Sequence, residues 1–578
     1  MSLTKISLGT MMFRTGRAFT VGKENQALSV SKSISVLEGR TFLLEKLPWV
    51  EVNPKLEMLP AVKPDQAGLA PLKKRTLQAA LRDPPKGGQA SFSMPRRGGV
   101  AAMSSLLSGA GFLWDFELAT TTSSKTWIAD RTYWLSGPVF VTNSVAEGGA
   151  ILKMTNGAKL TIAGPSVWPN DSRPVVITSV GDRFHGENIG TNAAPGGFIA
   201  DVALEFTSSQ TSNFVRNVRI LNAKKGVSFA AGTGHTLRHV QMVNVGVGVE
   251  AASGVAYKLQ NALFHQVLTN FLGSGSTAHV SHLTANTADW LSYSNQVTVN
   301  LTNSLIVAVA NSGSTTTNAV TRVATTNGVF QAVGSGYAYP AGGYILSGTN
   351  AIEPSLATDL AQRTVYPPTI LTNPFTSNTT LSTQVARDTS SFWRGFHYVP
   401  MDYAWSALSL TNSTLTLTNG ISVGFYGDRG LILQNGGKVV SYGGPTNTVR
   451  WSYHNTVQEQ PIAWGTNTSF SFLRVGSYTT LPSVLMRFTD VSVLGNHNGK
   501  RTFISDSPAN LAIRDSWLRS VMIYSFGTPV ATTIGLTNNF IHRGEFSAWQ
   551  HYFGSFYPIT LHVRNNLFLG NSLTVEYG

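Results

Sequence analysis

Three ionisable residues stand close together in the segment GDRFHGE: Asp182, His185 and Glu187. Positioned carboxyl and imidazole groups carry general acid–base chemistry, and carboxylate oxygens are the ligands that calcium prefers. These three residues are therefore candidates for catalysis, and Asp182 with Glu187 is the candidate cation pair, with calcium as the ion. The competing interpretation is a polar loop bounded by Gly181 and Gly186.

A second group of candidates lies near the C-terminal end, where Arg543 and Glu545 precede an aromatic run. Exposed aromatic faces with polar neighbours form interaction surfaces, and sugar rings bind on such surfaces. We expect a carbohydrate-binding surface here, and Arg543 with Glu545 as further catalytic candidates. The alternative is that the rings pack against the coil or a neighbouring domain. The residues expected to bind sugar are Trp549, Tyr552, Phe553 and Tyr557.

A repeat indicates which elements position these residues. In five successive triplets an apolar residue is followed two positions later by Asn or His, at steps of 22, 22, 21 and 21 residues. This spacing predicts one coil of a three-stranded parallel β-helix, in which coils stack about 4.8 Å apart. The Asn and His side chains would stack at a turn that needs left-handed backbone. The triplets begin at Val215, Leu237, Leu259, Val280 and Leu301.

A similar column returns near the C-terminus, at steps of 25, 23 and 27 residues, so the surplus residues should leave the coil as loops. We expect one structural ladder of turn residues in each stretch. Its members are Asn217, His239, Asn261, His282, Asn303, Asp490, Asp515, Asn538 and Asn565.

The fold class expected is therefore all-β: a right-handed parallel β-helix solenoid with about 21–27 residues per coil. We predict a basic, Pro-containing, largely irregular leader over 1–112 and β-helix stretches over 113–310 and 398–578. An irregular insertion with a short helix around 355–361 separates the two stretches. The strand pattern at Val575–Gly578 has no polar cap, so the sequence is expected to be truncated, with further coils or domains beyond residue 578.

Composition excludes several classes of site. The chain has no cysteine, so disulfides, thiolate metal sites and cysteine nucleophiles are absent. No apolar run is long enough to span a membrane, and the first residues are too weakly apolar for a clear signal peptide. Residues 1–112 carry 16 Lys and Arg against 7 Asp and Glu. Few aromatic residues stand near the basic runs of this region, Lys73-Lys74-Arg75 and Arg96-Arg97, so nucleic acid is not an expected partner.

Four segments carry a resemblance to known proteins: the leader phrase GRTFLLEKLPWVEVNPKLEML, then WDFELA from Trp114, EGGAILK from Glu147 and GDRFHGE from Gly181. With the repeat, they resemble the right-handed parallel β-helix proteins of the pectate-lyase-like superfamily. More specifically, the chain is similar to large β-helix surface and secreted proteins of environmental bacteria, a group that has no established reaction. The resemblance implies an extracellular or cell-surface location.

The catalytic strings of the superfamily are missing. Polygalacturonase-like enzymes use Asn-Thr-Asp, Asp-Asp, Gly-His-Gly and Arg-Ile-Lys, and none of these strings occurs here. We therefore expect a non-catalytic extracellular scaffold or adhesion module that binds polysaccharide or cell-envelope components. The alternative is a polysaccharide lyase or glycoside hydrolase that acts in the outer groove of the β-helix.

Overall fold

The computed structural model describes two units, Met1–Ala110 and Gly111–Gly578. The described residues are 5–7, 10–13, 31–37, 40–46 and 116–577, without 183, 188, 190–196, 210–211, 294–295, 332–338, 390–391, 459–469, 494–500, 506–508, 527–529, 551–558 and 570–571. In the first unit four strands form an antiparallel sheet in the order β1-β2-β4-β3, within a leader that the sequence analysis expected to be largely irregular. Its strands are β1 (Lys5–Ser7), β2 (Thr10–Phe13), β3 (Ser31–Leu37) and β4 (Arg40–Lys46).

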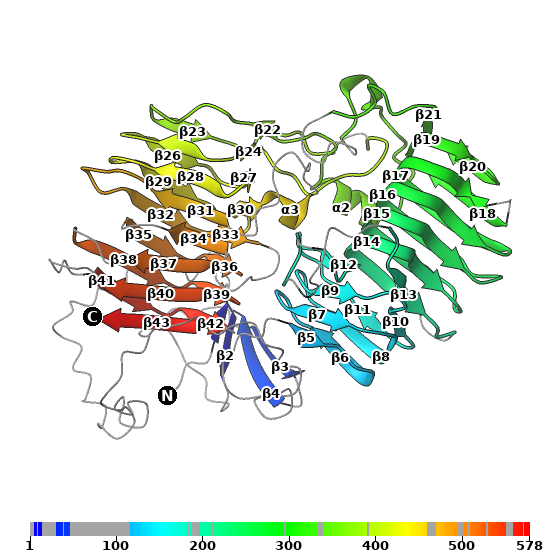
Figure 1. The fold of residues 1–578 in the computed structure, drawn as a ribbon, viewed down its shortest axis with the longest axis horizontal. Helices are drawn as coiled ribbons and strands as arrows, with labels where there is room; N and C mark the ends of the chain where they lie inside the picture. The colour runs from blue at the N-terminus through cyan, green and yellow to red at the C-terminus, as the bar shows by residue number, and fades with distance from the viewer. Residues whose placement is uncertain are drawn as a thin grey trace. The chain divides into compact units, whose positions relative to one another are not determined.

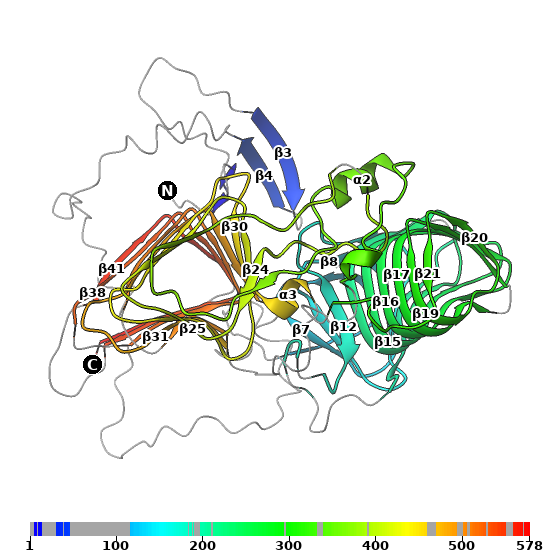
Figure 2. The same cartoon turned by 90° about the horizontal axis from the view of Figure 1, so that it is seen from above.

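The second unit holds two parallel β-helices, and Figures 1 and 2 show their strands as two stacks lying side by side. In the first β-helix every described strand pairs in parallel with strands of the neighbouring coils. Its strands are β5 (Glu117–Leu118), β6 (Thr122–Trp127), β7 (Thr132–Leu135), β8 (Val139–Ala146), β9 (Ile151–Met154), β10 (Lys159–Ile162), β11 (Ser166–Val167), β12 (Val175–Ser179), β13 (Ala200–Phe206), β14 (Phe214–Phe229), β15 (His235–Ala251), β16 (Ala256–Gly273), β17 (Ser276–Ser292), β18 (Val297–Thr302), β19 (Leu305–Asn311), β20 (Thr315–Asn318) and β21 (Thr321–Val323).

Two columns of left-handed residues bend each central coil. The expected ladder of Asn217, His239, Asn261, His282 and Asn303 has φ between 49° and 58° throughout. A second column, five residues further along each coil, has φ between 50° and 64° and was not anticipated. Short polar side chains tolerate this backbone by local hydrogen bonding. The second column consists of Asn222, Asn244, Gln266, Thr287 and Ala308.

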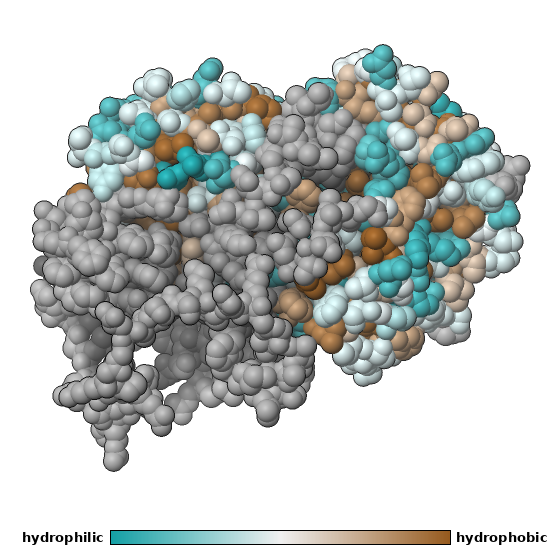
Figure 3. Space-filling model, in the orientation of Figure 1, coloured by the Kyte–Doolittle hydropathy of each residue, from teal (hydrophilic) through white to brown (hydrophobic). Residues whose placement is uncertain are grey.

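Apolar side chains fill the interior of the coils. The residues two positions before the first ladder, such as Val215, Leu237 and Leu259, are completely buried. Aromatic rings stack between coils as well, with 5.6 Å between the ring centroids of Phe206 and Phe229. On the face drawn in Figure 3, hydrophobic residues are mixed with hydrophilic ones over the first β-helix. The stack is therefore stabilised mainly from within, by burial that repeats once per coil.

A segment with little regular structure joins the two β-helices. It contains η3 (Gly342–Tyr344) and α2 (Pro354–Leu360), and α2 buries Leu356 and Leu360. Parallel strands end at Val323 and resume at Thr369, whereas the sequence analysis placed this segment at 311–397. The last strands before it and the first after it are short and Thr-rich, so they lack the apolar alternation that marks the other coils.

The second β-helix has three parallel sheets, and each coil contributes one strand to each sheet. The first sheet consists of β22 (Thr369–Ile370), β24 (Tyr403–Trp405), β27 (Ser422–Phe425), β30 (Val449–Tyr453), β33 (Thr489–Ser492), β36 (Trp517–Arg519), β39 (Phe540–His542) and β42 (Leu567–Leu569). The second consists of β23 (Thr379–Leu381), β26 (Thr414–Leu417), β29 (Lys438–Tyr442), β32 (Ser483–Arg487), β35 (Asn510–Arg514), β38 (Thr532–Thr537) and β41 (Ile559–Arg564). The third consists of β25 (Leu408–Leu410), β28 (Arg429–Leu433), β31 (Phe470–Val475), β34 (Arg501–Ser505), β37 (Met522–Phe526), β40 (Glu545–Gln550) and β43 (Ser572–Tyr577). A four-residue helix, α3 (His454–Val457), follows β30.

One member of the expected ladder was misplaced. Strand pairing sets Met486 opposite Ile513 and Arg487 opposite Arg514, so the residue that stacks on Asp515 is Phe488. Phe488 has a φ of 48°, in line with 53° at Asp515, whereas Asp490 lies two residues further on, in β33. The sequence analysis chose Asp490 because it is acidic like Asp515. The residue at the left-handed corner is instead set by the register of the apolar residues that face the interior.

Candidate functional site

The three residues of the GDRFHGE segment are buried. Asp182 is 3% exposed, and His185 and Glu187 are each 8% exposed. The Asp182 carboxylate accepts hydrogen bonds from Thr178 Oγ1 at 2.7 Å and from the backbone amide of Phe184 at 2.7 Å, and it contacts His185 Nδ1 at 2.8 Å. Burial raises the pKa of Asp182, but the charge and hydrogen bond of His185 outweigh it, so the pKa is lowered overall. The carboxylate is satisfied within the protein.

Lys153 completes this cluster from β9. Its Nζ donates to the carbonyl oxygens of Asp182 at 2.6 Å and Glu187 at 2.5 Å. Burial lowers the pKa of Lys153 to about 8. No group of three or more His, Asp or Glu side chains that could hold a metal ion occurs in the described ranges. The structure thus places Asp182, His185 and Glu187 in a buried, hydrogen-bonded network, and their roles in catalysis or cation binding stay predictions.

This network extends to the second β-helix through arginine. Arg219 donates from Nε to Gln241 Oε1 at 2.8 Å, and from Nη1 to the carbonyl oxygen of Asn455 at 2.7 Å. Its Nη1 also lies 3.5 Å from His185 Nε2. Further along, Arg519 of β36 pairs with Asp171 at 3.1 Å. Buried charges are retained where such bonds compensate for lost hydration, so these contacts hold the two β-helices together.

The C-terminal candidates fall largely outside the described residues. Arg543 lies at a left-handed corner with a φ of 55°, and burial lowers its pKa. The backbones of Glu545 and Trp549 belong to β40, but their side chains are not described. Tyr552, Phe553 and Tyr557 lie outside the described residues. The aromatic carbohydrate-binding surface therefore stays a prediction.

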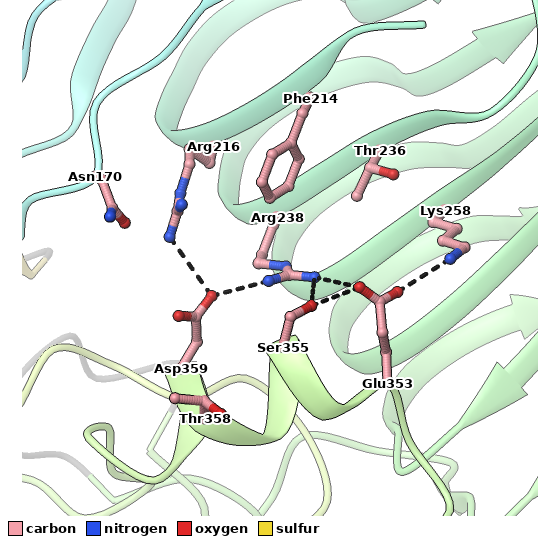
Figure 4. Close-up of a pocket in the computed structure, with 10 residues that line it drawn as sticks. All are labelled: Asn170, Phe214, Arg216, Thr236, Arg238, Lys258, Glu353, Ser355, Thr358 and Asp359. Atoms are coloured by element: carbon pink, nitrogen blue, oxygen red, sulfur yellow. Dashed lines mark hydrogen bonds and ion pairs between the residues drawn. The ribbon is translucent and has the colours of Figure 1, made fainter.

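A pocket of about 510 Å³ opens on the outer face of β14, β15 and β16, opposite α2 (Figure 4). We call it the basic pocket. Arg216 and Arg238 occupy the same register position on β14 and β15, while Phe214, Thr236 and Lys258 share another on β14, β15 and β16. Because strand pairing aligns these positions, basic side chains recur one coil apart, about 4.8 Å. Its lining residues are Asn170, Phe214, Arg216, Thr236, Arg238, Lys258, Glu353, Ser355, Thr358 and Asp359.

Carboxylates at and beside α2 pair with these basic residues. Glu353 Oε1 contacts Arg238 Nη2 at 3.0 Å, and its Oε2 contacts Lys258 Nζ at 3.0 Å. Asp359 Oδ2 contacts Arg238 Nη1 at 3.0 Å and Arg216 Nη2 at a longer 3.5 Å. Hydrogen bonds from Ser355 and Gln260, with those from Lys258, lower the pKa of Glu353 to about 2. Glu353 is thus held in the ionised form.

The Phe214 ring provides the apolar wall of the basic pocket. The side chain is 41% exposed, and the guanidinium carbons of Arg216 and Arg238 lie 5.3 and 5.0 Å from the ring centroid. Cations near the face of an aromatic ring are attracted by its quadrupole. Figure 4 shows the Phe214 ring beside the side chains of Arg216 and Arg238.

A smaller pocket of about 150 Å³ adjoins the basic pocket and shares Asn170, Arg216 and Asp359 with it. Arg363 follows α2, and Arg450 reaches the pocket from β30 of the second β-helix. His239 of the ladder also faces it. Asn261 Nδ2 lies 2.9 Å from His239 Nδ1, so Nε2 carries the hydrogen and donates to Asp359 at 3.3 Å. Burial lowers the pKa of His239, which fits this neutral tautomer.

The sequence analysis missed both pockets, although one signal was present. Arg216 and Arg238 are the middle residues of two of the triplets that revealed the repeat, so the period already placed them one coil apart. No sequence pattern linked them to Glu353 and Asp359, which lie more than 110 residues further along the chain. In the part of the chain that the structure describes, no helix is long and apolar enough to cross a membrane.

Comparisons with known proteins do not identify a family or an activity for this chain. No protein-family model matches the chain, and no curated protein sequence matches it. Among solved structures, a mutant of the PL6 family alginate lyase AlyGC is similar at 11% identity and a TM-score of 0.17. The match covers 80% of this chain and 93% of that chain. The residues of the two pockets therefore remain the basis for assigning a function.

Proposed function

We propose that this chain is a non-catalytic extracellular or cell-surface β-helix module that binds carbohydrate, and that the basic pocket is its sugar-binding site. The observation that carries the proposal is the exposed Phe214 ring, which lies beside two guanidinium groups in a pocket otherwise lined by polar side chains. An aromatic face packs against the C–H surface of a sugar ring, while charged and polar groups bind its hydroxyls.

The size and repetition of the pocket support this proposal. About 510 Å³ lies within the range of ligand pockets, roughly 300–1,000 Å³. Arg216 and Arg238 lie one coil apart along the β-helix axis, and Gln260 has the same register position on the next coil, so a glycan chain that lies along this axis would meet polar groups in succession. A solenoid scaffold is rigid and extended, which suits adhesion to a polymer.

The protonation states favour binding over hydrolysis. A glycosidase needs one carboxylic acid whose pKa is raised so that it can protonate the leaving group. In the basic pocket the pKa of Glu353 is lowered to about 2, and the pKa of Asp359 is lowered too, since hydrogen bonds from His239 and Arg238 outweigh its burial. Neither carboxyl group is poised to donate a proton at neutral pH.

The experiment is binding of the full chain to a panel of neutral and acidic polysaccharides, measured by affinity electrophoresis and calorimetry. Phe214→Ala should weaken binding about tenfold, equivalent to about 1.4 kcal/mol. Phe140→Ala is the matched control, because Phe140 is 43% exposed on the same β-helix but does not line the basic pocket. Equal affinities of the two variants, or no binding by the parent chain, would contradict the proposal.

The same incubations test the alternative of a lyase or hydrolase. Mass spectrometry of the supernatants detects released oligosaccharides, and an unsaturated product would identify a lyase. Release that is abolished by Phe214→Ala but kept by Phe140→Ala would place catalysis in the basic pocket and replace the non-catalytic proposal.

A further inference from the structure

Three guanidinium groups converge on the smaller pocket from three different parts of the fold. Arg216 comes from β14, Arg363 from the segment after α2 and Arg450 from β30. Like charges in a small, partly buried space repel one another. Burial, together with the charges of Arg216 and Arg450 and against the opposing effect of Asp359, lowers the pKa of Arg363 to about 10. We call this site the guanidinium pocket.

The carboxylates that face this cluster are already engaged. Asp359 is shared among Arg216, Arg238 and His239. Asp171, the other acidic residue of the lining, pairs with Arg519 at 3.1 Å. The local positive charge is therefore not fully compensated by the residues that the structure describes.

Arg450 is the least compensated of the three. Its side chain makes no hydrogen bond or ion pair with any described residue, whereas Arg363 donates to Asn217 Oδ1 at 3.2 Å. The two acids whose charge reaches Arg450, Asp402 and Asp490, pair instead with Arg387 and Arg519. An uncompensated guanidinium beside two others costs stability, and such costs are typical of binding sites that a ligand completes.

The chemistry of the missing partner follows from these groups. The planar guanidinium fork matches the oxygens of carboxylate and sulfate groups, and it binds them with charge-assisted hydrogen bonds. At about 150 Å³ the pocket has less than a third of the volume of the basic pocket, so it suits an acidic substituent better than a sugar ring. Because the pockets share Arg216 and Asn170, a ring in one can extend a substituent into the other.

We infer that the guanidinium pocket binds the oxyanion, a carboxylate or a sulfate ester, of an acidic sugar whose ring occupies the basic pocket. This inference rests on the proposed function for the position of the ring. The oxyanion site itself rests only on the arginine cluster. It makes the module selective for acidic over neutral glycans.

The test uses the full chain and four probes at constant ionic strength: inorganic sulfate, galacturonate, galactose 6-sulfate and galactose. We expect both acidic sugars, or the one whose group fits, to bind at least about tenfold more tightly than galactose. Arg450→Gln should abolish this preference, and Arg429→Gln should retain it. Arg429 is the matched control because it is an arginine of the same β-helix that lies outside both pockets. The stronger of the two acidic probes identifies the group.

Thermal unfolding separates a binding role from a structural one. In chloride buffer Arg450→Gln should melt no lower than the parent chain, since it removes repulsion and no bond, and sulfate should raise the melting temperature of the parent alone. A lower melting temperature of Arg450→Gln in chloride, or an unchanged acidic preference, overturns the inference. Sulfate binding through Arg450 without sugar binding supports the oxyanion site and overturns the proposed function. Sugar binding that needs Phe214 but not Arg450 supports the proposed function and overturns the oxyanion site.

Discussion

Arg219 of β14 donates a hydrogen bond of 2.7 Å to the backbone carbonyl of Asn455, which lies 236 residues further along the chain in α3. Arg219 is 1% exposed and holds Gln241 with the same guanidinium. The bond joins the outer face of the first β-helix to a single helical turn of the second. The pairing of the two β-helices thus depends on buried polar contacts.

Replacing Arg219 with methionine, which keeps much of the volume, should lower the free energy of unfolding by about 3 kcal/mol. The change leaves two buried acceptors, the Asn455 carbonyl oxygen and the Gln241 side-chain oxygen, without their guanidinium donor. Urea unfolding followed by tryptophan fluorescence measures the effect. Arg322→Met, at an exposed position of the same β-helix, should change stability by less than about 0.5 kcal/mol. Equal urea midpoints for the two variants would contradict the role given to Arg219.

Acid should destabilise the chain below pH 6.5 because buried histidines are kept neutral. Burial lowers the pKa of His454 from 6.5 to about 3 and that of His265 to about 4. Between pH 6.5 and these values the unfolded chain binds more protons than the folded one, so stability falls as the pH falls. His454→Gln should flatten this dependence by up to about 1.4 kcal/mol per pH unit. Urea midpoints at pH 6.5, 5.8 and 5.0 measure the slope, and an unchanged slope in His454→Gln would refute the assignment.

The asparagine ladder also joins the segment between β23 and β24 of the second β-helix to the first β-helix, and Asn261 shows how. Its Nδ2 donates to the His397 carbonyl at 2.9 Å, and its Oδ1 accepts from the His397 amide at 2.7 Å. Asn261→Ala should lower the free energy of unfolding by about 3 kcal/mol, since it loses these bonds and keeps a φ of 55°. Asn261→Gly should lose about 1 kcal/mol less, because glycine adopts this backbone freely. Equal losses in thermal unfolding would show that backbone strain plays no part.

Glu353 limits the charge of the basic pocket. Glu353→Gln removes the carboxylate that faces Arg238 and Lys258, so affinity for acidic polysaccharides should rise about threefold to tenfold at low salt. The gain should shrink as salt screens it. Calorimetry at two ionic strengths measures the effect. Asp201→Asn is the control, since Asp201 is an exposed carboxylate on the same β-helix, paired with Lys224. Equal changes in both variants would show a nonspecific effect of net charge.

The sequence alone predicted the first solenoid because a β-helix repeats its constraints once per coil. Every coil needs an apolar residue facing the interior and a residue that tolerates left-handed backbone at the corner, and both needs are visible in the triplets that contain Asn217, Asn261 and Asn303. The second corner was invisible, because its members vary from Asn222 to Ala308 and share no side chain type. Asp490 was assigned to the ladder because its side chain type matches that of Asp515. The strand pairing, which the sequence does not show, instead sets Phe488 next to Asp515.

The sequence also determined which ionisable residues are neighbours along the chain, as at Asp182 and His185, but not whether water reaches them. Their burial depends on Lys153 and Arg219, which other coils bring in. The guanidinium pocket is the extreme case, since Arg216 and Arg450 are 234 positions apart. Nearest-neighbour stacking makes the coils of each β-helix predictable from local periodicity. The contact between two β-helices repeats nowhere in the sequence, so only the tertiary structure could place these arginines in one pocket.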